Sequence, residues 1–415
     1  MKQKLQKNIS VGGKNIDLSN LPYGMVADGE LGLLLASNEM SGKVIHENPY
    51  AGIYETRATV TPKGDYLLMF PDALPGTVRQ SGKNGHYAAS KTKTNNLIAY
   101  RSSDKGKSWK GPSMPLNIDY NMHSFIPLIP RNSQRIYAFG TQPRWDKFNG
   151  VENAAIGFRY SDDDGFTWSD VTFIEPVNDS DFQAMSAMRM CETDRGTWIL
   201  GAHAGTPFFK QEDGSMTTCT RQYLIRSEDK GKTWTVLPDK RPNGWFAEGF
   251  NRMDEGRPIN IGNGEVYFMS RTCEGHLWSS RSLDDGKTWS KLAPTPLVHP
   301  DAPPMLFHLG DGKTLAAFHH NSHTGSHFND NAMRDRGQLW ISLSRDGGMT
   351  WSKPRFVLSN IVAPDGTGAW CEDNCSYIDL FSDNGVLNIF MPHRWRRCLH
   401  IQMEESAIEM LPDNL

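Results

Sequence analysis

The sequence lacks an excess of either charge and lacks any long apolar run. Its 415 residues include 44 lysines and arginines against 47 aspartates and glutamates. This near balance gives no electrostatic footprint for binding nucleic acid. No stretch approaches the roughly 20 consecutive apolar residues that a membrane-spanning helix needs. We therefore expect neither a nucleic-acid partner nor a membrane span.

Cysteine is also scarce. The six cysteines form no Cys-x-x-Cys pair, and only Cys371 and Cys375 lie close together in the sequence. No second pair is present to complete a zinc site, so we expect free thiols rather than disulfides, no metal and no cofactor. The first ten residues, MKQKLQKNIS, contain no apolar signal-peptide region. The chain is therefore expected to be either cytoplasmic or a mature form whose leader was trimmed.

What the sequence does contain is one eight-residue phrase in five copies, which reads Ser-x-Asp-x-Gly-x-Thr/Ser-Trp. Successive copies lie roughly 55 to 65 residues apart, and a period of that size is typical of stacked supersecondary units. The copies are Ser102–Trp109, Ser161–Trp168, Ser227–Trp234, Ser282–Trp289 and Ser344–Trp351.

The chemistry of the phrase is that of a tight turn. An apolar or aromatic run that favours a strand precedes each copy, for example LIAY before the first and LWISL before the fifth. Serine and aspartate side chains can bond nearby backbone amides, and glycine permits a positive φ. The tryptophan that ends each copy has a large face to bury. We therefore predict that the repeated aspartates are structural and not catalytic.

The phrase resembles the Asp-box of the sialidase-like β-propellers. A second recurring pattern supports the resemblance: an apolar stretch, a turn with glycine and another apolar stretch. It occurs at Thr59–Phe70, Ile259–Arg271, Met305–Phe318 and Tyr377–Phe390. The resemblance implies an all-β fold, a six-bladed β-propeller of four-stranded blades that forms a single domain over residues 1–415. We expect the segment 1–51 to complete the last blade, with the apolar run Leu31–Ala36 as the closing strand.

The resemblance also implies a glutamate and two arginines at one mouth of the central channel. Glu255 opens the fourth inner strand and Arg271 ends its hairpin partner, where sialidases carry a glutamate and an arginine. Arg336, with Arg334 as a neighbouring alternative, precedes the fifth Asp-box, where sialidases carry another arginine. Since a guanidinium matches a carboxylate bidentately, the two arginines are expected to bind the carboxylate of an acidic sugar.

Other sialidase positions have no one-to-one match. Tyr54 takes the place of the first arginine, and Arg57 falls three residues later, where it can still contact the substrate if the strand starts differently. In sialidases the loop before the first Asp-box holds an acid/base aspartate. Here that loop contains no acid, and His86 is its only side chain that titrates near neutrality. The position of the nucleophilic tyrosine falls one or two residues before Tyr377.

Two reaction courses stay open. In a retaining reaction Tyr377 is the nucleophile and Glu255 draws off its proton. In an inverting reaction Glu255 pairs with Glu372 or Asp373, which stand at the sixth channel entrance, and the wider spacing admits a water molecule. Trp370 lies near the same entrance, where it can stack on a sugar or pack in the core.

Two further segments and two more aromatic residues call for interpretation. His319–Asp330 (HHNSHTGSHFND) holds four histidines, but their spacing fits no strong zinc motif, so we prefer a substrate-facing loop to a metal site. Met391–His400 (MPHRWRRCLH) is basic and aromatic, and a packing cluster or solvated rim is preferred to a contact with an anionic polymer. Trp245 and Phe246 can either stack on sugars or pack in the core.

The resemblance and these positions together imply an exo-acting glycoside hydrolase that removes a terminal acidic sugar, sialic acid first, from a glycan or sialoglycoconjugate. One alternative is a hydrolase or lyase that acts on another uronate-bearing polysaccharide. A second is a catalytically silent glycan-binding propeller. The missing acid in the first loop favours this second alternative, whereas Glu255 and the channel arginines count against it. The sequence does not specify an oligomeric state.

Overall fold

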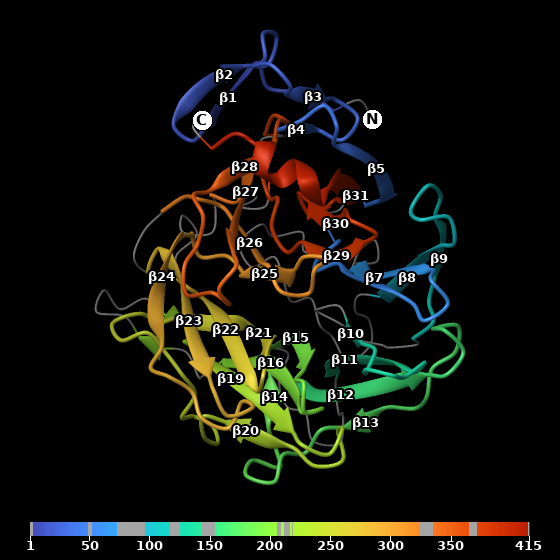
Figure 1. Cartoon of the computed structure of the whole chain (residues 1–415), viewed down its shortest axis with the longest axis vertical. Helices are drawn as coiled ribbons and strands as arrows, with labels where there is room; N and C mark the ends of the chain where they lie inside the picture. The colour runs from blue at the N-terminus through green and yellow to red at the C-terminus, as the bar shows by residue number, and fades with distance from the viewer. Residues whose placement is uncertain are drawn as a thin grey trace.

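The computed structural model describes residues 3–48, 52–72, 96–116, 125–142, 154–205, 209–210, 216–217, 219–323, 335–364, 372–413 and 415. In these residues, strands form six sheets of four or more strands around a ring (Figure 1). The predicted all-β, six-bladed propeller is therefore confirmed. One short 3-10 helix, η1 (Glu405–Met410), follows the last strand. No helix within the described ranges is long and apolar enough to cross a membrane.

The first three blades are antiparallel sheets built from consecutive strands. Blade one contains β6 (Arg57–Val60), β7 (Tyr66–Asp72), β8 (Asn96–Ser102) and β9 (Lys110–Ser113). Blade two contains β10 (Ile126–Leu128), β11 (Ile136–Gln142), β12 (Ala154–Ser161) and β13 (Thr172–Phe173), and β14 (Gln183–Ala184) also pairs with β12. Blade three contains β15 (Ser186–Glu192), β16 (Trp198–Gly205), β19 (Thr220–Ser227) and β20 (Thr235–Leu237). Between β16 and β19, β17 (Phe209–Lys210) pairs with β18 (Met216–Thr217).

The last three blades continue the ring. Blade four contains β21 (Met253–Gly262), β22 (Glu265–Thr272), β23 (His276–Ser282) and β24 (Ala293–Val298). Blade five contains β25 (Met305–His308), β26 (Leu315–His319), β27 (Gln338–Ser344) and β28 (Arg355–Asn360), extended by β4 (Leu33–Leu35) and β3 (Val26–Asp28). Blade six contains β29 (Asp379–Asp383), β30 (Val386–His393), β31 (Arg397–Glu404) and β5 (Ser41–Glu47). A separate hairpin consists of β1 (Asn8–Val11) and β2 (Lys14–Asp17).

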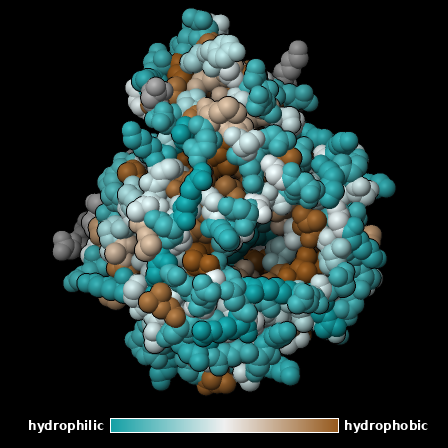
Figure 2. Space-filling model, viewed as in Figure 1, coloured by the Kyte–Doolittle hydropathy of each residue, from teal (hydrophilic) through white to brown (hydrophobic). Residues whose placement is uncertain are grey.

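The first strand of each blade lies innermost. Around the ring β6 contacts β10, β10 contacts β15, β15 contacts β21, β21 contacts β25, β25 contacts β29 and β29 contacts β6. Residues at the starts of these six strands therefore converge although they are far apart in the sequence. Figure 2 shows that the face seen down the short axis is mostly hydrophilic and is hollowed near its centre, with hydrophobic residues around the hollow.

The five Asp-boxes form the turns that join the third and fourth strands of blades one to five. In the third copy Asp229 Oδ1 accepts a hydrogen bond from the Thr233 amide at 2.8 Å, and Ser227 Oγ accepts one from the Gly231 amide at 2.8 Å. The same bonds recur in the other four copies. Trp234 is buried and packs edge-on against Phe139 of blade two. The predicted turn geometry and the structural role of the tryptophan in this copy are thus confirmed.

The N-terminal segment joins two blades, and one expectation about it is wrong. The apolar run Leu31–Ala36 does not supply the closing strand, because its strand β4 lies between β28 and β3 in blade five. The fourth strand of blade six is instead β5, which pairs with β31. The apolar pattern led to the wrong strand because β4, which is buried between β28 and β3, needs the same hydrophobic residues as a closing strand would.

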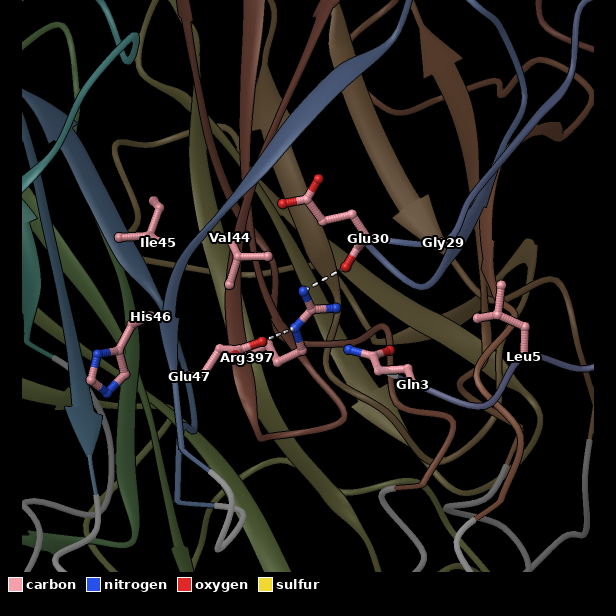
Figure 3. Close-up of a pocket in the computed structure, with 9 residues that line it drawn as sticks. All are labelled: Gln3, Leu5, Gly29, Glu30, Val44, Ile45, His46, Glu47 and Arg397. Atoms are coloured by element: carbon pink, nitrogen blue, oxygen red, sulfur yellow. Dashed lines mark hydrogen bonds and ion pairs between the residues drawn. The ribbon is translucent and has the colours of Figure 1, made fainter. Parts of the chain in front are cut away.

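Arg397 fixes this N-terminal segment to blade six. Its Nε pairs with Glu47 at 2.9 Å, and one Nη atom donates to the carbonyl oxygen of Glu30 at 2.6 Å (Figure 3). The other Nη atom donates to the carbonyl oxygen of Leu31 at 2.8 Å. The guanidinium lies at a cavity of about 1030 Å³ that Gln3 and residues of β5 also line. The hydrogen-bonding groups of Arg397 are used by these partners, so we interpret the cavity as a feature of the place where β5 and β31 close the ring.

Candidate active site

The inner strands of blades four and six bring Glu255 and Tyr377 together. The hydroxyl of Tyr377 donates a hydrogen bond to Glu255 Oε1 at 2.7 Å, across 122 residues of sequence. Both side chains are buried, with 2% of Glu255 and 7% of Tyr377 exposed. A phenol that donates to a buried carboxylate is the arrangement that a tyrosine nucleophile and its base require.

Both residues of this pair have a left-handed backbone. The φ angle is 51° at Glu255 and 62° at Tyr377. Glu255 lies in a bulge of β21, where the pairing with β22 skips from Asp254 to Arg257. Each such non-glycine residue costs of order 1–3 kcal/mol and is retained only where the surrounding structure enforces it. Strain of this kind, placed at two contacting residues, supports a functional role for them.

Two arginines lie against the pair. Arg271 is the second-last residue of β22 and pairs with Asp254. Its Nη1 donates to Glu255 Oε2 at 2.6 Å and to the Tyr377 hydroxyl at 3.3 Å. Arg336 comes two residues before β27, and its guanidinium carbon lies 5.9 Å from the centroid of the Tyr377 ring. Both arginines are 1% exposed. The structure thus brings together four residues that the sequence analysis selected from blades four, five and six.

Three charged residues to which the sequence analysis assigned no role complete this network. Asp301 Oδ1 accepts a hydrogen bond from Arg271 Nε at 2.6 Å. Arg252 Nε donates to Asp254 Oδ2 at 2.7 Å and lies 3.3 Å from Asp301 Oδ1. The available signal was position, because Arg252 and Asp254 stand at the start of an inner strand and Asp301 lies just before the next one.

The electrostatics define the protonation of the pair. Burial alone would raise the pKa of Glu255, but the positive charges of Arg271 and Arg252 outweigh it and lower the pKa below the usual range. Burial and the negative charge of Glu255 raise the pKa of Tyr377. Burial and repulsion by Arg271 lower the pKa of Arg336 to about 10. At neutral pH the site therefore holds a charged carboxylate that accepts a hydrogen bond from a neutral phenol, and both shifts keep the proton on Tyr377 in the resting site.

An aromatic wall flanks Tyr377 on the side of blade one. Tyr54 is 7% exposed and packs edge-on against Trp395 with ring centroids 5.0 Å apart. These two rings form a buried cluster with Met188 and Tyr377. Arg57 is also buried, and its guanidinium pairs with Glu55 at 2.7 Å. Tyr54 is thus part of a buried aromatic cluster, and Arg57 is held by a carboxylate of its own chain segment.

The remaining candidates lie apart from the pair or outside the described residues. Asp373 lines a cavity of about 440 Å³ beneath the β1–β2 hairpin, together with Asp335 and His320. The carbonyl oxygen of Glu372 accepts a hydrogen bond from Arg394 Nε at 2.5 Å. The remaining candidates that lie outside the described residues are His86, Arg334 and Trp370.

The other singled-out segments are mostly structural. His319 and His320 are buried and bonded to backbone carbonyls and serines, and residues 324–330 lie outside the described part of the chain. Within that described part, no three His, Cys, Asp or Glu side chains cluster as metal ligands would. Met391–His400 forms strands β30 and β31 and is largely buried, so the preferred packing interpretation is confirmed.

The two remaining aromatic residues have different environments. Trp245 packs against Phe268 and Trp289, with ring centroids 5.9 and 6.2 Å away, so it belongs to the core. Phe246 is 50% exposed and covers the guanidinium of Arg221 at 4.0 Å. Only Phe246 of this pair is therefore accessible to a sugar.

Comparison with known proteins is consistent with this architecture. A family model described as a BNR repeat-like domain matches residues 119–389, more than half of the chain. A xyloglucanase of a Paenibacillus species is 26% identical over 227 residues, which make up 51% of this chain and only 20% of that protein. The chain thus spans about a fifth of this curated relative.

Solved structures with a similar fold include two sialidases. A Hadza microbial sialidase superposes with a TM-score of 0.60 at 16% identity, over 86% of this chain and 66% of that one. The NanB sialidase of Streptococcus pneumoniae superposes with a TM-score of 0.59 at 12% identity, over 91% of this chain and 72% of that one. At these identities the likeness establishes a common fold and no more.

Proposed function

Because this chain belongs to the family of BNR repeat-like domains, we propose that it is a glycoside hydrolase with its active site at the Glu255–Tyr377 pair. We further propose that it removes a terminal acidic sugar, sialic acid first, from a glycan. The observation that carries the proposal is the hydrogen bond of 2.7 Å from the Tyr377 hydroxyl to Glu255, buried beside two arginines.

The pair supports a retaining reaction. Tyr377 Oη attacks the anomeric carbon and forms a covalent glycosyl–enzyme bond, while its proton passes to Glu255 Oε1. The bond to the leaving group breaks as that oxygen takes a proton from an acid, for which His86 is the candidate from the sequence. A water molecule then attacks the anomeric carbon and gives a proton to the group that acted as the acid, the bond to Tyr377 breaks, and the phenol recovers its proton from Glu255. Two displacements return the original anomeric configuration.

The arginines supply recognition of charge. Arg336 lies over the ring of Tyr377, so a sugar bound to that residue would lie within reach of its guanidinium. Arg271 contacts both members of the pair through Nη1. A positively charged wall on one side of the nucleophile suits a sugar that carries a carboxylate at or next to its anomeric carbon.

A second candidate is a hydrolase of a polysaccharide other than a sialoglycan. Two observations favour it: the aromatic Tyr54 where sialidases have their first arginine, and the similarity to a xyloglucanase. An aromatic wall favours the apolar face of a sugar ring over a carboxylate. Under this alternative the same pair, Glu255 and Tyr377, acts on a neutral or uronate sugar.

The deciding experiment is incubation with a fluorogenic sialoside and with a panel of plant and bacterial polysaccharides, with products followed by NMR. Release of sialic acid in the α configuration first, with mutarotation afterwards, is expected for the retaining reaction. The variant Glu255→Gln serves as the control, because it must abolish any release that this site catalyses. Release from polysaccharide alone would support the second candidate, and no release from any substrate would contradict both.

A further inference from the structure

The loop that joins β24 to β25 carries the sequence His-Pro-Asp-Ala-Pro-Pro at residues 299–304. We propose that Asp301 in this loop is a positioning residue that fixes both channel arginines and keeps Glu255 available to Tyr377. This inference rests on the proposed function, in which Glu255 is the base. Asp301 itself touches neither Glu255 nor Tyr377 in any contact of the described residues, and it acts through Arg271.

Asp301 binds the two arginines with two different groups. Its carboxylate Oδ1 accepts from Arg271 Nε at 2.6 Å, and its backbone carbonyl accepts from Arg271 Nη2 at 3.2 Å. The same carbonyl also accepts a hydrogen bond from Arg336 Nη2. The side chain of Asp301 is fully buried, and Arg252 is the other cation next to it, at 3.3 Å. One residue thus sets the orientation of guanidinium groups from blades four and five.

The consequence for catalysis follows from the shape of a guanidinium. Arginine pairs best with a carboxylate through two parallel bonds, and an unrestrained Arg271 would bind both oxygens of Glu255 in this way. Asp301 occupies the Nε and Nη2 edge, so only Nη1 reaches Glu255, at Oε2. Glu255 Oε1 is therefore left to accept the hydrogen bond from Tyr377. Asp301 protects the base by engaging the competing donors.

The loop around Asp301 is held rigidly. Three of its six residues are prolines, whose φ angles are fixed. His299 Nδ1 accepts a hydrogen bond from the His320 amide at 3.2 Å, so the proton is on Nε2, which donates to the carbonyl of Ala302 at 3.0 Å. The two imidazole rings stack with centroids 5.0 Å apart. The loop cannot shift without breaking these buried contacts.

The same histidines connect the loop to the nucleophile. His320 Nδ1 donates to the carbonyl of Gln338, so its Nε2 accepts from the hydroxyl of Ser376 at 2.9 Å. Ser376 directly precedes Tyr377, and the amide of Cys375 donates to the carbonyl of Arg336 at 2.8 Å. A continuous set of buried bonds therefore joins the Asp301 loop to the chain segment that carries the nucleophile.

The test compares two variants of Asp301 with a matched control. Asp301→Ala removes the carboxylate, whereas Asp301→Asn keeps one oxygen that can accept from Arg271 Nε. With a fluorogenic sialoside we expect kcat to fall roughly tenfold in Asp301→Asn and roughly a hundredfold in Asp301→Ala, as for loss of a charged hydrogen bond. The control is Asp164→Asn, a buried carboxylate that pairs with Arg101 at 3.1 Å on the Asp-box side of the ring. We expect its kcat to equal that of the wild type.

A crystal structure of Asp301→Ala gives a readout that does not depend on activity. We expect Arg271 to turn and bind both oxygens of Glu255, and the Tyr377 hydroxyl to move out of hydrogen-bond distance. If Arg271 keeps its position, or if kcat falls equally in Asp164→Asn, the inference is wrong even though the hydrolase proposal stands. If the wild type hydrolyses no glycoside, the hydrolase proposal fails while the structure still decides the role of Asp301.

Discussion

Asp229 in the third Asp-box and Glu255 at the channel mouth are both carboxylates held by hydrogen bonds, but their partners lie at different distances in the sequence. Asp229 binds residues two to four positions away, Ser227 and Thr233. Glu255 binds Arg271 and Tyr377, which are 16 and 122 residues away. The first arrangement recurs in every Asp-box, whereas the second joins residues of blades four and six.

The two environments also control charge by different means. In the Asp-box, hydrogen bonds from Thr233 lower the pKa of Asp229 to about 2 although the group is close to solvent. At the mouth, burial opposes the charge of Glu255, and the nearby arginines outweigh that effect. A repeated local contact stabilises a turn. A long-range contact of charged groups in a desolvated place is where a catalytic role is worth testing.

The largest expected effect comes from removing the charge of Glu255. In Glu255→Gln the shape and one acceptor are kept but the base is lost, so turnover should fall roughly a hundredfold or more, the usual scale of general-base catalysis. Substrate binding should change little, as measured by steady-state kinetics and calorimetry. The matched control is Glu265→Gln, which also loses a partner arginine, Arg281, but lies away from the site. Normal turnover in Glu255→Gln would exclude the residue as the base.

The second effect separates the arginines of the mouth from those of the rim. Arg336→Ala should lose about 1.5–3 kcal/mol of transition-state binding, roughly 10- to 150-fold in kcat/KM, because a charged hydrogen bond to the substrate disappears. A methyl-esterified sialoside should lose a comparable factor with the wild type. Arg101→Ala, which removes an arginine bound to Asp164, should keep its kcat/KM. Equal rates on acid and ester would rule out recognition of the carboxylate.

The third prediction concerns stability alone. Asp229→Ala leaves the amide of Thr233 and the hydroxyls of Ser227 and Thr233 without their acceptor. We expect the free energy of unfolding to fall by about 1–3 kcal/mol, measured by urea titration. Turnover per folded molecule should stay unchanged. A large loss of turnover at unchanged stability would mean that the Asp-boxes also contribute to catalysis.

The smallest expected effect is a difference in how stability depends on pH between the buried histidines and the Asp-boxes. Burial lowers the pKa of His320 to about 3, below its unfolded value near 6.5. Between these values the unfolded state binds the extra proton, so stability falls as the pH falls from 6.5 towards 3. The contribution of Asp229, with a folded pKa of about 2, is lost only below its unfolded value of 3.8.

Urea titrations between pH 4.5 and 6.5 therefore test the buried histidines without the Asp-boxes. The variant His320→Gln should reduce the slope of stability against pH by up to about 1.4 kcal/mol per pH unit. Asp229→Ala should be less stable by a constant amount and keep the slope of the wild type. An unchanged slope in His320→Gln would show that this histidine takes up its proton in the folded protein.

The sequence predicted those features that depend on short separations. The Asp-box bonds join residues within four positions, so a single copy is enough to predict their chemistry. The inner-strand pattern and the family resemblance together predicted six blades. The proximity of Glu255 and Arg271 could also be predicted, because they lie on the two strands of one hairpin. Their contact follows from the turn between those strands.

The features that escaped prediction depend on backbone irregularity or on contacts between blades. Counting back along a regular strand does not anticipate that the backbone of Tyr377 is left-handed, which changes the direction of its side chain. Asp301 belongs to no repeat, and its partners become neighbours only when blades four and five assemble. The closing strand β5 has few apolar residues, so the more apolar run Leu31–Ala36 was predicted to be the closing strand instead.

The pairing of β5 with β31 sets the order in which the ring can be completed. Glu47 and Arg397, which join these strands, are separated by 350 residues. During synthesis β5 leaves the ribosome long before β31. It therefore has no partner in blade six until the five intervening blades and β31 have been made. Closure of so long a loop is entropically costly and slow. A circular permutant in which β5 follows β31 directly would replace this search by the formation of a hairpin and should fold faster.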